Sequence, residues 1–220
     1  MMDELTGQEW LALGEERFAE GDKAAARAAW EQAARAGEYL AMYNLACMYY
    51  FGDEVEQDAE ISFSWFLRAA EAGDAEAANR LGVMCELGQG TPASAEAAFA
   101  WYERSAEAGS LSGMANLGLC YLEGKGVTAN VSRGLEWLEK ASAEGNGAAS
   151  LTLGRYYRDG RYVAQDYEYA RQCFERGIPQ LYAPPVLELA DMYEQGLGGP
   201  ADPVKAATLR KLAAEIPEED

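Results

Sequence analysis

The stretch that decides the fold is Gly109–Glu144, GSLSGMANLGLCYLEGKGVTANVSRGLEWLEKASAE. It contains two apolar runs of helical spacing, one around Leu117 and one around Trp137, separated by the helix-breaking segment Gly-Lys-Gly. The same pattern returns when the sequence is shifted by 36 residues in either direction. Such a period predicts stacked helix–turn–helix units that share one continuous core. The five repeats are 37–72, 73–108, 109–144, 145–180 and 181–216.

Five positions of the repeat predict how its helices begin, end and pack. The ninth is leucine and the tenth is Gly or Ala, which allows two helices to cross closely. The sixteenth is a glycine that ends the first helix, and the twenty-second is a polar cap that begins the second. The twenty-ninth is tryptophan in three repeats, which we expect in the core. These residues are Leu45, Leu81, Leu117, Leu153 and Leu189; Ala46, Gly82, Gly118, Gly154 and Ala190; Gly52, Gly88, Gly124, Gly160 and Gly196; Asp58, Ser94, Asn130, Asp166 and Asp202; and Trp65, Trp101 and Trp137.

The two ends of the chain depart from the repeat. Residues 1–36 are predicted to form an N-terminal capping unit with a tighter turn at Glu20-Gly21-Asp22, and this shorter turn resembles the plain tetratricopeptide pattern. Pro184-Pro185 is expected to begin a helix, because proline is accepted in a first turn. The last helix, near Val204–Ile216, has no successor, so its outer face is either polar or an association surface; its basic residues favour a polar face. Residues 217–220 are an acidic tail.

The charge of the chain restricts its partners. The 220 residues include 18 basic and 37 acidic side chains, for a net charge of −19. Residues 1–108 contain 21 acidic and 7 basic side chains, a net charge of −14. Nucleic acids and anionic membranes are poor partners for this surface, whereas a basic protein or peptide would be attracted to its N-terminal half. The alternative is that the acidity only keeps an alanine-rich protein soluble.

Cysteine and histidine usage argues against metal and cofactor chemistry. The chain has no histidine, so the commonest general base is missing and a zinc site is not expected. Cys47, Cys85, Cys120 and Cys173 form no C-x-x-C pair and are expected to be buried, reduced thiols. No apolar run approaches the roughly 18 residues of a membrane span, and the acidic start lacks a secretion signal. We therefore expect a cytoplasmic, non-catalytic protein without a cofactor.

The repeat resembles the Sel-1-like repeat family, a relative of the tetratricopeptide repeat. The resemblance covers residues 37–216, and the fourth repeat departs from it at Tyr162, where the family has glycine, and at Cys173, where it has tryptophan. Packing is therefore expected to be least regular between the fourth and fifth repeats. In the third repeat the resemblance rests on Leu117-Gly118, Tyr121, Gly124-x-Gly126-Val127, Asn130 and Trp137.

The resemblance implies an all-α, right-handed α-solenoid whose first helices line a concave groove. Members of the family are mostly adaptors that assemble protein complexes or receive peptides in that groove. Some secreted, cysteine-rich members are linked to β-lactam binding and hydrolysis, but the paired cysteines of their repeats are absent here.

Groove candidates follow from the helical phase of the first helices. If the ninth-place leucine points into the core, the eighth, eleventh and fifteenth places point away from it. In related repeats an asparagine in this column holds a bound peptide backbone, and an amide offers both a donor and an acceptor. Arginines here suit capture of a carboxylate. Alternatively, the asparagines bond a neighbouring helix or water, and the arginines pair with Glu86, Asp159 or Asp191. The candidates are Asn44, Tyr50, Arg80, Glu86, Asn116, Glu123, Arg155, Arg158 and Asp191.

Two uses of such a scaffold remain open from the sequence. The first is an adaptor that binds a protein or peptide in its groove. The second is an inhibitor, such as an immunity protein that neutralises a basic toxin or effector, in which the acidic N-terminal half carries the binding. An enzyme that handles β-lactams is a distant third.

Overall fold

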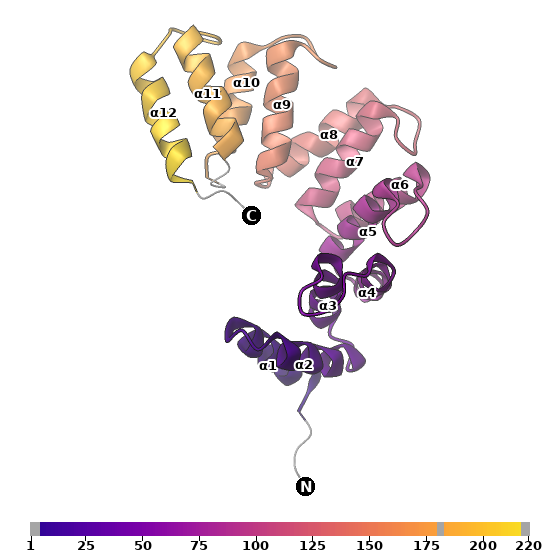
Figure 1. Ribbon diagram of the computed structural model, residues 1–220. Helices are drawn as coiled ribbons and strands as arrows, with labels where there is room; N and C mark the ends of the chain where they lie inside the picture. The colour runs from indigo at the N-terminus through magenta and orange to yellow at the C-terminus, as the bar shows by residue number, and fades with distance from the viewer. Residues whose placement is uncertain (1–4, 180–182, 217–220) are drawn as a thin grey trace. The chain divides into compact units, whose positions relative to one another are not determined.

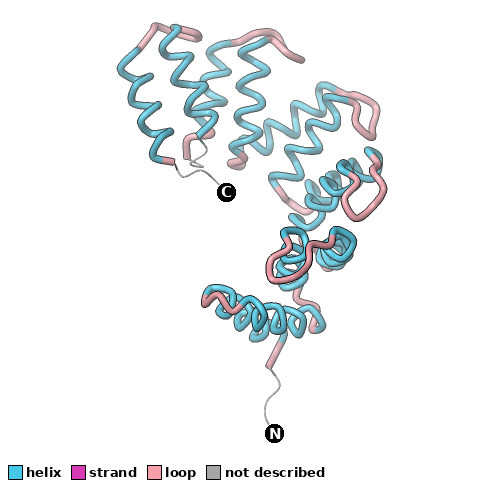
Figure 2. Tube along the Cα trace, viewed as in Figure 1, coloured by secondary structure: helices cyan, strands magenta, loops and turns pink. Residues whose placement is uncertain are grey.

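A computed structural model describes residues 5–179 and 183–216 of the 220-residue chain, so the predicted acidic tail lies outside the described residues. The described residues form twelve α-helices and no strand, which confirms the predicted all-α fold (Figures 1 and 2). Each of these helices has 13 residues except α10, which has 10. The helices are α1 (Gly7–Ala19), α2 (Lys23–Arg35), α3 (Tyr39–Phe51), α4 (Ala59–Glu71), α5 (Ala75–Leu87), α6 (Ala95–Glu107), α7 (Leu111–Glu123), α8 (Val131–Ala143), α9 (Gly147–Asp159), α10 (Tyr167–Arg176), α11 (Ala183–Gln195) and α12 (Pro203–Glu215).

The helices are grouped in two compact halves, Met1–Gly113 and Met114–Asp220. In the N-terminal half, α1 packs on α2, α3 on α4 and α5 on α6, and consecutive pairs meet through α2 with α3 and α4 with α5. The C-terminal half contains the pairs α9 with α10 and α11 with α12. Each pair is a helical hairpin that is too short to be stable alone, so contacts between hairpins are needed for folding.

The turn inside each repeat is held by two recurring hydrogen bonds. The N–H of the cap residue at the twenty-second place donates to the carbonyl of the thirteenth; one example is Asp166 to Tyr157 at 2.8 Å. The N–H of the seventeenth place donates to the carbonyl of the twelfth, for example Arg161 to Tyr156 at 3.0 Å. Both bonds occur in all five repeats. The sixteenth-place glycine has a positive φ in every repeat, as predicted for a residue that ends a helix. The side chain of the twenty-second-place cap accepts a hydrogen bond from a backbone N–H in the first turn of the second helix, also as predicted.

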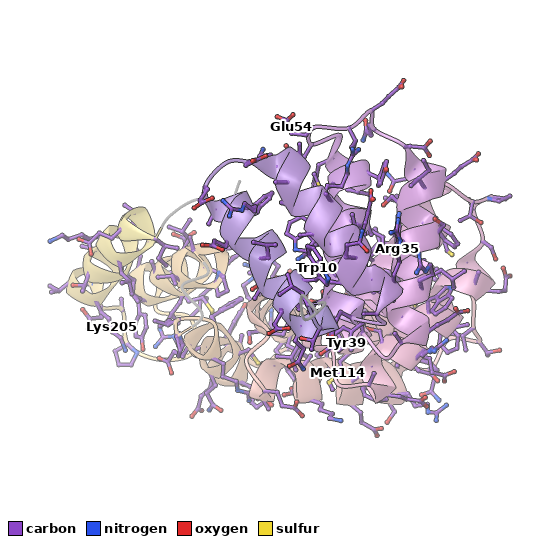
Figure 3. The ribbon with its side chains drawn as sticks, turned by 90° about the horizontal axis from the view of Figure 1, so that it is seen from below. Trp10, Arg35, Tyr39, Glu54, Met114 and Lys205 are labelled. Atoms are coloured by element: carbon purple, nitrogen blue, oxygen red, sulfur yellow. The ribbon has the colours of Figure 1, made fainter. Side chains whose placement is uncertain are left out.

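The eighteenth place also has a positive φ in each repeat, although two residues there are not glycine. Glu54 has φ 57° and Tyr162 has φ 66°, whereas Gly90 and Gly198 have φ 67° and 78°. Glu54 is exposed and comes from the loop between α3 and α4, where Figure 3 labels it at the outer edge of the view. The left-handed backbone is therefore set by the turn, and glycine is the residue that adopts it without strain.

The ninth-place leucines and tenth-place small residues pack as predicted. All five leucines are at most 1% exposed. A Cβ added at Gly154 would lie 2.3 Å from the ring of Phe174, and one added at Gly82 would lie 2.4 Å from the ring of Tyr102. Since ordinary carbon contacts are about 3.5–4.0 Å, the aromatic ring of the second helix occupies the space that a side chain would need. At Gly118 the side chain of Leu138 and the carbonyl of Gly134 occupy this space instead, each 2.9 Å from an added Cβ.

The prediction that the twenty-ninth-place tryptophans form the core is correct only in part, because Trp65 and Trp101 pack against the core without being fully buried. Trp65, Trp101 and Trp137 are only half-buried. The buried side chain is the next residue, at most 2% exposed: Phe66, Tyr102, Leu138 and Phe174 in the first four repeats. Each tryptophan instead lies beside a cation three residues later, with Arg68 at 4.1 Å, Arg104 at 5.3 Å and Lys140 at 5.3 Å from the ring centroids. This spacing is that of adjacent turns on a helix surface and allows cation–π attraction.

The fourth and fifth repeats meet irregularly, as predicted. Helix α10 is three residues shorter than the other helices, and a Cβ added at Gly177 would lie 2.7 Å from Pro185 near the start of α11. Helix α12, which carries Lys205 (labelled in Figure 3), buries Ala206, Leu209 and Ala213, while its basic side chains are exposed. These exposed cations agree with a polar outer face at this end of the array.

The cysteines are reduced, as predicted, but one is not fully buried. Cys85, Cys120 and Cys173 are buried, whereas Cys47 is half-buried. Burial raises the pKa of the Cys47 thiol and raises that of Cys173 to about 12. Neutral thiols of this kind are poor nucleophiles, so these cysteines contribute to packing.

Candidate protein-binding site

All nine predicted site residues lie on first helices of the repeats. Helix α3 contains Asn44 and Tyr50, α5 contains Arg80 and Glu86, and α7 contains Asn116 and Glu123; Arg155 and Arg158 belong to α9 and Asp191 to α11. Four of them are in the N-terminal half and five in the C-terminal half. The two sets are described separately.

In the N-terminal half, three of the four candidates bond to neighbouring side chains. The Tyr50 hydroxyl donates to Gln89 Oε1 at 3.1 Å. Glu86 accepts from the hydroxyl of Tyr102 at 3.0 Å, which satisfies a phenol that is almost fully buried. Arg80 hydrogen-bonds Tyr43; burial raises the pKa of the Tyr43 phenol, and this bond opposes the rise. These contacts hold α3, α5 and α6 together.

Asn44 differs from these three residues. Its side chain is half-buried and makes no hydrogen bond to any part of the chain that the structure describes. It lines a pocket of about 370 Å³ together with residues of α1, α2 and α3. Its amide is therefore available to a partner, and the peptide-holding role of this column stays a prediction.

The walls of this pocket are mainly apolar. The lining residues include Phe18 from α1, Trp30 from α2, and Cys47, Met48 and Phe51 from α3. The rings of Phe18 and Trp30 are 5.4 Å apart. Two carboxylates, Glu15 and Asp53, also line it. Asp53 binds Lys23 Nζ at 2.6 Å, which ties the loop after α3 to the start of α2.

In the C-terminal half, the two candidate arginines share one acid. Arg155 Nη2 lies 2.6 Å from a Glu188 carboxylate oxygen, and Arg158 Nη1 pairs with the other oxygen. Arg158 also binds Asp159 at 2.6 Å, and this hydrogen bond lowers the pKa of Asp159. The pairing acids are thus Glu188 and Asp159, of which the sequence suggested only Asp159.

The remaining candidates of this half are also near charged or polar groups. Asp191 lies 2.8 Å from Arg210 of α12, so it does not pair with the α9 arginines. Glu123 pairs with Lys125 at 3.1 Å, and Asn116 is half-buried on α7. This half therefore presents a largely neutralised set of charges on α9 and α11.

Comparison with sequence families gives a match to the Sel1 repeat over five segments, 40–74, 75–110, 111–146, 148–178 and 187–215. These segments cover most of the chain. The chain belongs to the Sel1 repeat family. Among curated proteins no sequence match was found.

Solved structures show the same fold in other Sel1 repeat proteins. A protective antigen present in uropathogenic Escherichia coli strains is 30% identical with a TM-score of 0.82; the match covers 95% of this chain and 46% of the antigen, so the chain spans about half its length. A Sel1 repeat protein from Oxalobacter formigenes is 28% identical with a TM-score of 0.78, covering 95% and 86%. An immunity protein from Pseudomonas aeruginosa is 20% identical with a TM-score of 0.63, covering 87% and 73%, and shares the fold.

Sequence reasoning missed most of the pocket of this Sel1 repeat protein. Asn44 was selected, but Phe18 and Trp30 were not, because repeat columns do not compare the capping unit with the first repeat. One signal was available in the sequence. The first helix of the first repeat, 39–51, contains no charged residue, whereas the first helix of each other repeat contains at least one. The described residues contain no group of three or more His, Cys, Asp or Glu that could hold a metal ion, and none of their helices is long and apolar enough to cross a membrane.

Proposed function

We propose that this Sel1 repeat protein is a non-catalytic scaffold that binds a basic protein or peptide through its N-terminal half. The observation that supports this most is the excess of acidic side chains there, 21 against 7 basic ones in residues 1–108. Sel1 repeats are a scaffold fold, and an acidic surface attracts a basic partner over about a Debye length.

Few of these acids are neutralised within their own half. The ion pairs that join described residues of this half are Arg17 with Glu20, Lys23 with Asp53 and Arg27 with Glu31. Other basic side chains lie on aromatic rings, as Arg68 and Arg104 do. In contrast, residues 109–180 contain eight acidic and eight basic side chains. Residues 181–220 contain eight acidic and three basic side chains, so most of the net charge of −19, namely −14, lies in residues 1–108.

The charge proposal is tested with matched reversals at equivalent helix ends. Glu71 is the last residue of α4 and Glu144 follows the last residue of α8, and both are exposed. A partner is captured from extract of the cells that produce the protein, identified by mass spectrometry, purified, and its Kd measured by calorimetry at 50 and 500 mM salt. We expect Glu71→Lys to weaken binding several-fold at low salt and Glu144→Lys to have no effect. Equal effects, or binding that is independent of salt, would refute an acidic docking half.

A second candidate is a dedicated inhibitor of a basic toxin or effector. Proteins of the same fold from Pseudomonas aeruginosa are described as immunity proteins, and this chain has the acidic surface that such a role requires. The two uses separate in the capture experiment above. A dedicated inhibitor should retain a single basic protein bound one to one, whereas an adaptor should retain several partners.

A further inference from the structure

The pocket between the capping unit and the first repeat is lined mainly by apolar side chains, whereas the pockets around Gly88 and around Glu56 in the same half are mainly polar. We infer that it receives one large apolar side chain of the partner, flanked by lysine or arginine. This inference rests on the proposed function and specifies the chemistry that its acidic half recognises. The volume of about 370 Å³ lies at the lower end of the range for ligand pockets and suits a single aromatic anchor with its adjacent backbone.

Two exposed aromatic side chains line the opening. Phe18 of α1 is 42% exposed and Phe51 of α3 is 68% exposed, while the ring of Trp30 behind them is 4% exposed. Large apolar side chains around a buried ring leave apolar surface in water, and burying this surface favours association. Buried aromatic anchors in such pockets carry most of the binding energy of protein interfaces.

Helix α3 is unusual among the first helices. It contains no charged residue, whereas each of the other five first helices (α1, α5, α7, α9 and α11) has at least one. Its core face buries Ala41, Leu45 and Met48, yet Tyr39 and Leu40 are also more than 40% exposed. A helix that is apolar on all sides is normally covered on all sides. The exposed side of α3 is therefore suited to a partner.

The polar groups of the pocket select the neighbours of the anchor. The free amide of Asn44 can donate to and accept from an extended peptide backbone. Glu15 is exposed and forms no ion pair within the described part of the chain, so a lysine or arginine beside the anchor can pair with it. Asp53 already holds Lys23 and keeps the loop in place. A partner segment with a carboxylate at these positions would be repelled.

The test uses three synthetic peptides and the 220-residue protein. The peptides are acetyl-Gly-Gly-X-Z-X-Gly-Gly-amide with X-Z-X as Lys-Trp-Lys, Lys-Gly-Lys or Glu-Trp-Glu. Binding is followed by ¹H–¹⁵N NMR, with the indole N–H of Trp30 and the side-chain amide of Asn44 as reporters. We expect the Lys-Trp-Lys peptide alone to shift both reporters in a saturable way.

A matched pair of variants locates the site. Phe51 and Leu87 occupy the same place in successive repeats and are both exposed, at 68% and 61%, so neither substitution removes core packing. Phe51→Ala should weaken Lys-Trp-Lys binding about tenfold, as expected of an anchor contact, while Leu87→Ala leaves it unchanged. Three results would contradict the proposed anchor pocket: equal effects of the two substitutions, equally tight binding of the Lys-Gly-Lys peptide, or no shift of the Trp30 and Asn44 signals at millimolar Lys-Trp-Lys peptide. Those results leave the acidic docking half intact, because the Glu71→Lys comparison decides that proposal separately.

Discussion

Gly90→Ala tests why the turn inside the second repeat, between α5 and α6, requires glycine. Gly90 has φ 67°, and an added Cβ would lie 2.1 Å from the carbonyl oxygen of Ala59 and 2.6 Å from its carbonyl carbon. Ala59 begins α4, so the loop after α5 lies directly on the preceding repeat. The atoms in the way belong to a backbone, which cannot move aside by changing a rotamer. The loop itself must therefore be displaced.

The expected change in the free energy of unfolding combines two destabilising contributions and one stabilising contribution. The left-handed conformation costs alanine about 1–2 kcal/mol. Displacing the loop from its packed position costs about 1–3 kcal/mol, by analogy with overpacked sites. Alanine loses less entropy on folding than glycine, which returns about 0.5–1 kcal/mol. We expect Gly90→Ala to lower the free energy of unfolding by about 1–4 kcal/mol, and Tm by roughly 3–15 °C.

The control is the equivalent position of the first repeat. Glu54 already has φ 57° with a full side chain, so Glu54→Ala should change the free energy of unfolding by less than about 0.5 kcal/mol. Both variants are compared by thermal and urea unfolding followed by circular dichroism. If Gly90→Ala is as stable as Glu54→Ala, the close approach of the loop to α4 is not what requires glycine. The reasoning would then be wrong.

Two further predictions concern a helix cap and the thiols. Asp166→Ala removes the acceptor for the N–H of Tyr169 at the start of α10 and should cost about 1 kcal/mol in urea unfolding, while Asp166→Asn costs less than half of that. The pKa of Cys173 is raised to about 12 by burial, so the folded state keeps a neutral thiol that ionises in the unfolded chain above about pH 8.5. Stability should therefore fall as the pH rises from 8.5 towards 12, and the fall in Tm between pH 7 and 10 should be smaller in Cys173→Ala; an identical fall in both proteins would contradict this.

The features that could be predicted from the sequence are those fixed by local chemistry. A glycine such as Gly160 and a cap such as Asp166 act on their own turn, so their spacing alone defines the ends of the helices. The buried Leu153 follows from helical period in the same way. The repeat makes these signals stronger because each is seen five times.

The assignment of the core to tryptophan was correct only in part because two adjacent columns were both apolar. Trp101 is followed by Tyr102 and Trp137 by Leu138, and in each pair the second residue is the more deeply buried. Recurrence drew attention to the tryptophan, but its large ring is rarely fully buried. The cation three residues later was a better indicator of which side of the helix faces solvent. Arg104 and Lys140 keep their charged groups in water, so the tryptophan ring beneath each of them lies near the surface.

The candidate site was harder to predict because pairing between repeats depends on distance rather than on column. Arg155 and Arg158 are in different columns, yet both pair with Glu188 of the next repeat. They therefore neutralise a carboxylate of this chain and are not available to a carboxylate of a partner. Asn44 is in the same column as Glu188, but it adjoins the capping unit, whose shorter turn and Phe18 leave a pocket beside it. One column therefore provides an internal ion pair at one repeat and an open amide at another. We therefore propose that the binding residues of this chain are those that the neighbouring repeat leaves without a partner, and their identity follows from the structure rather than from the column.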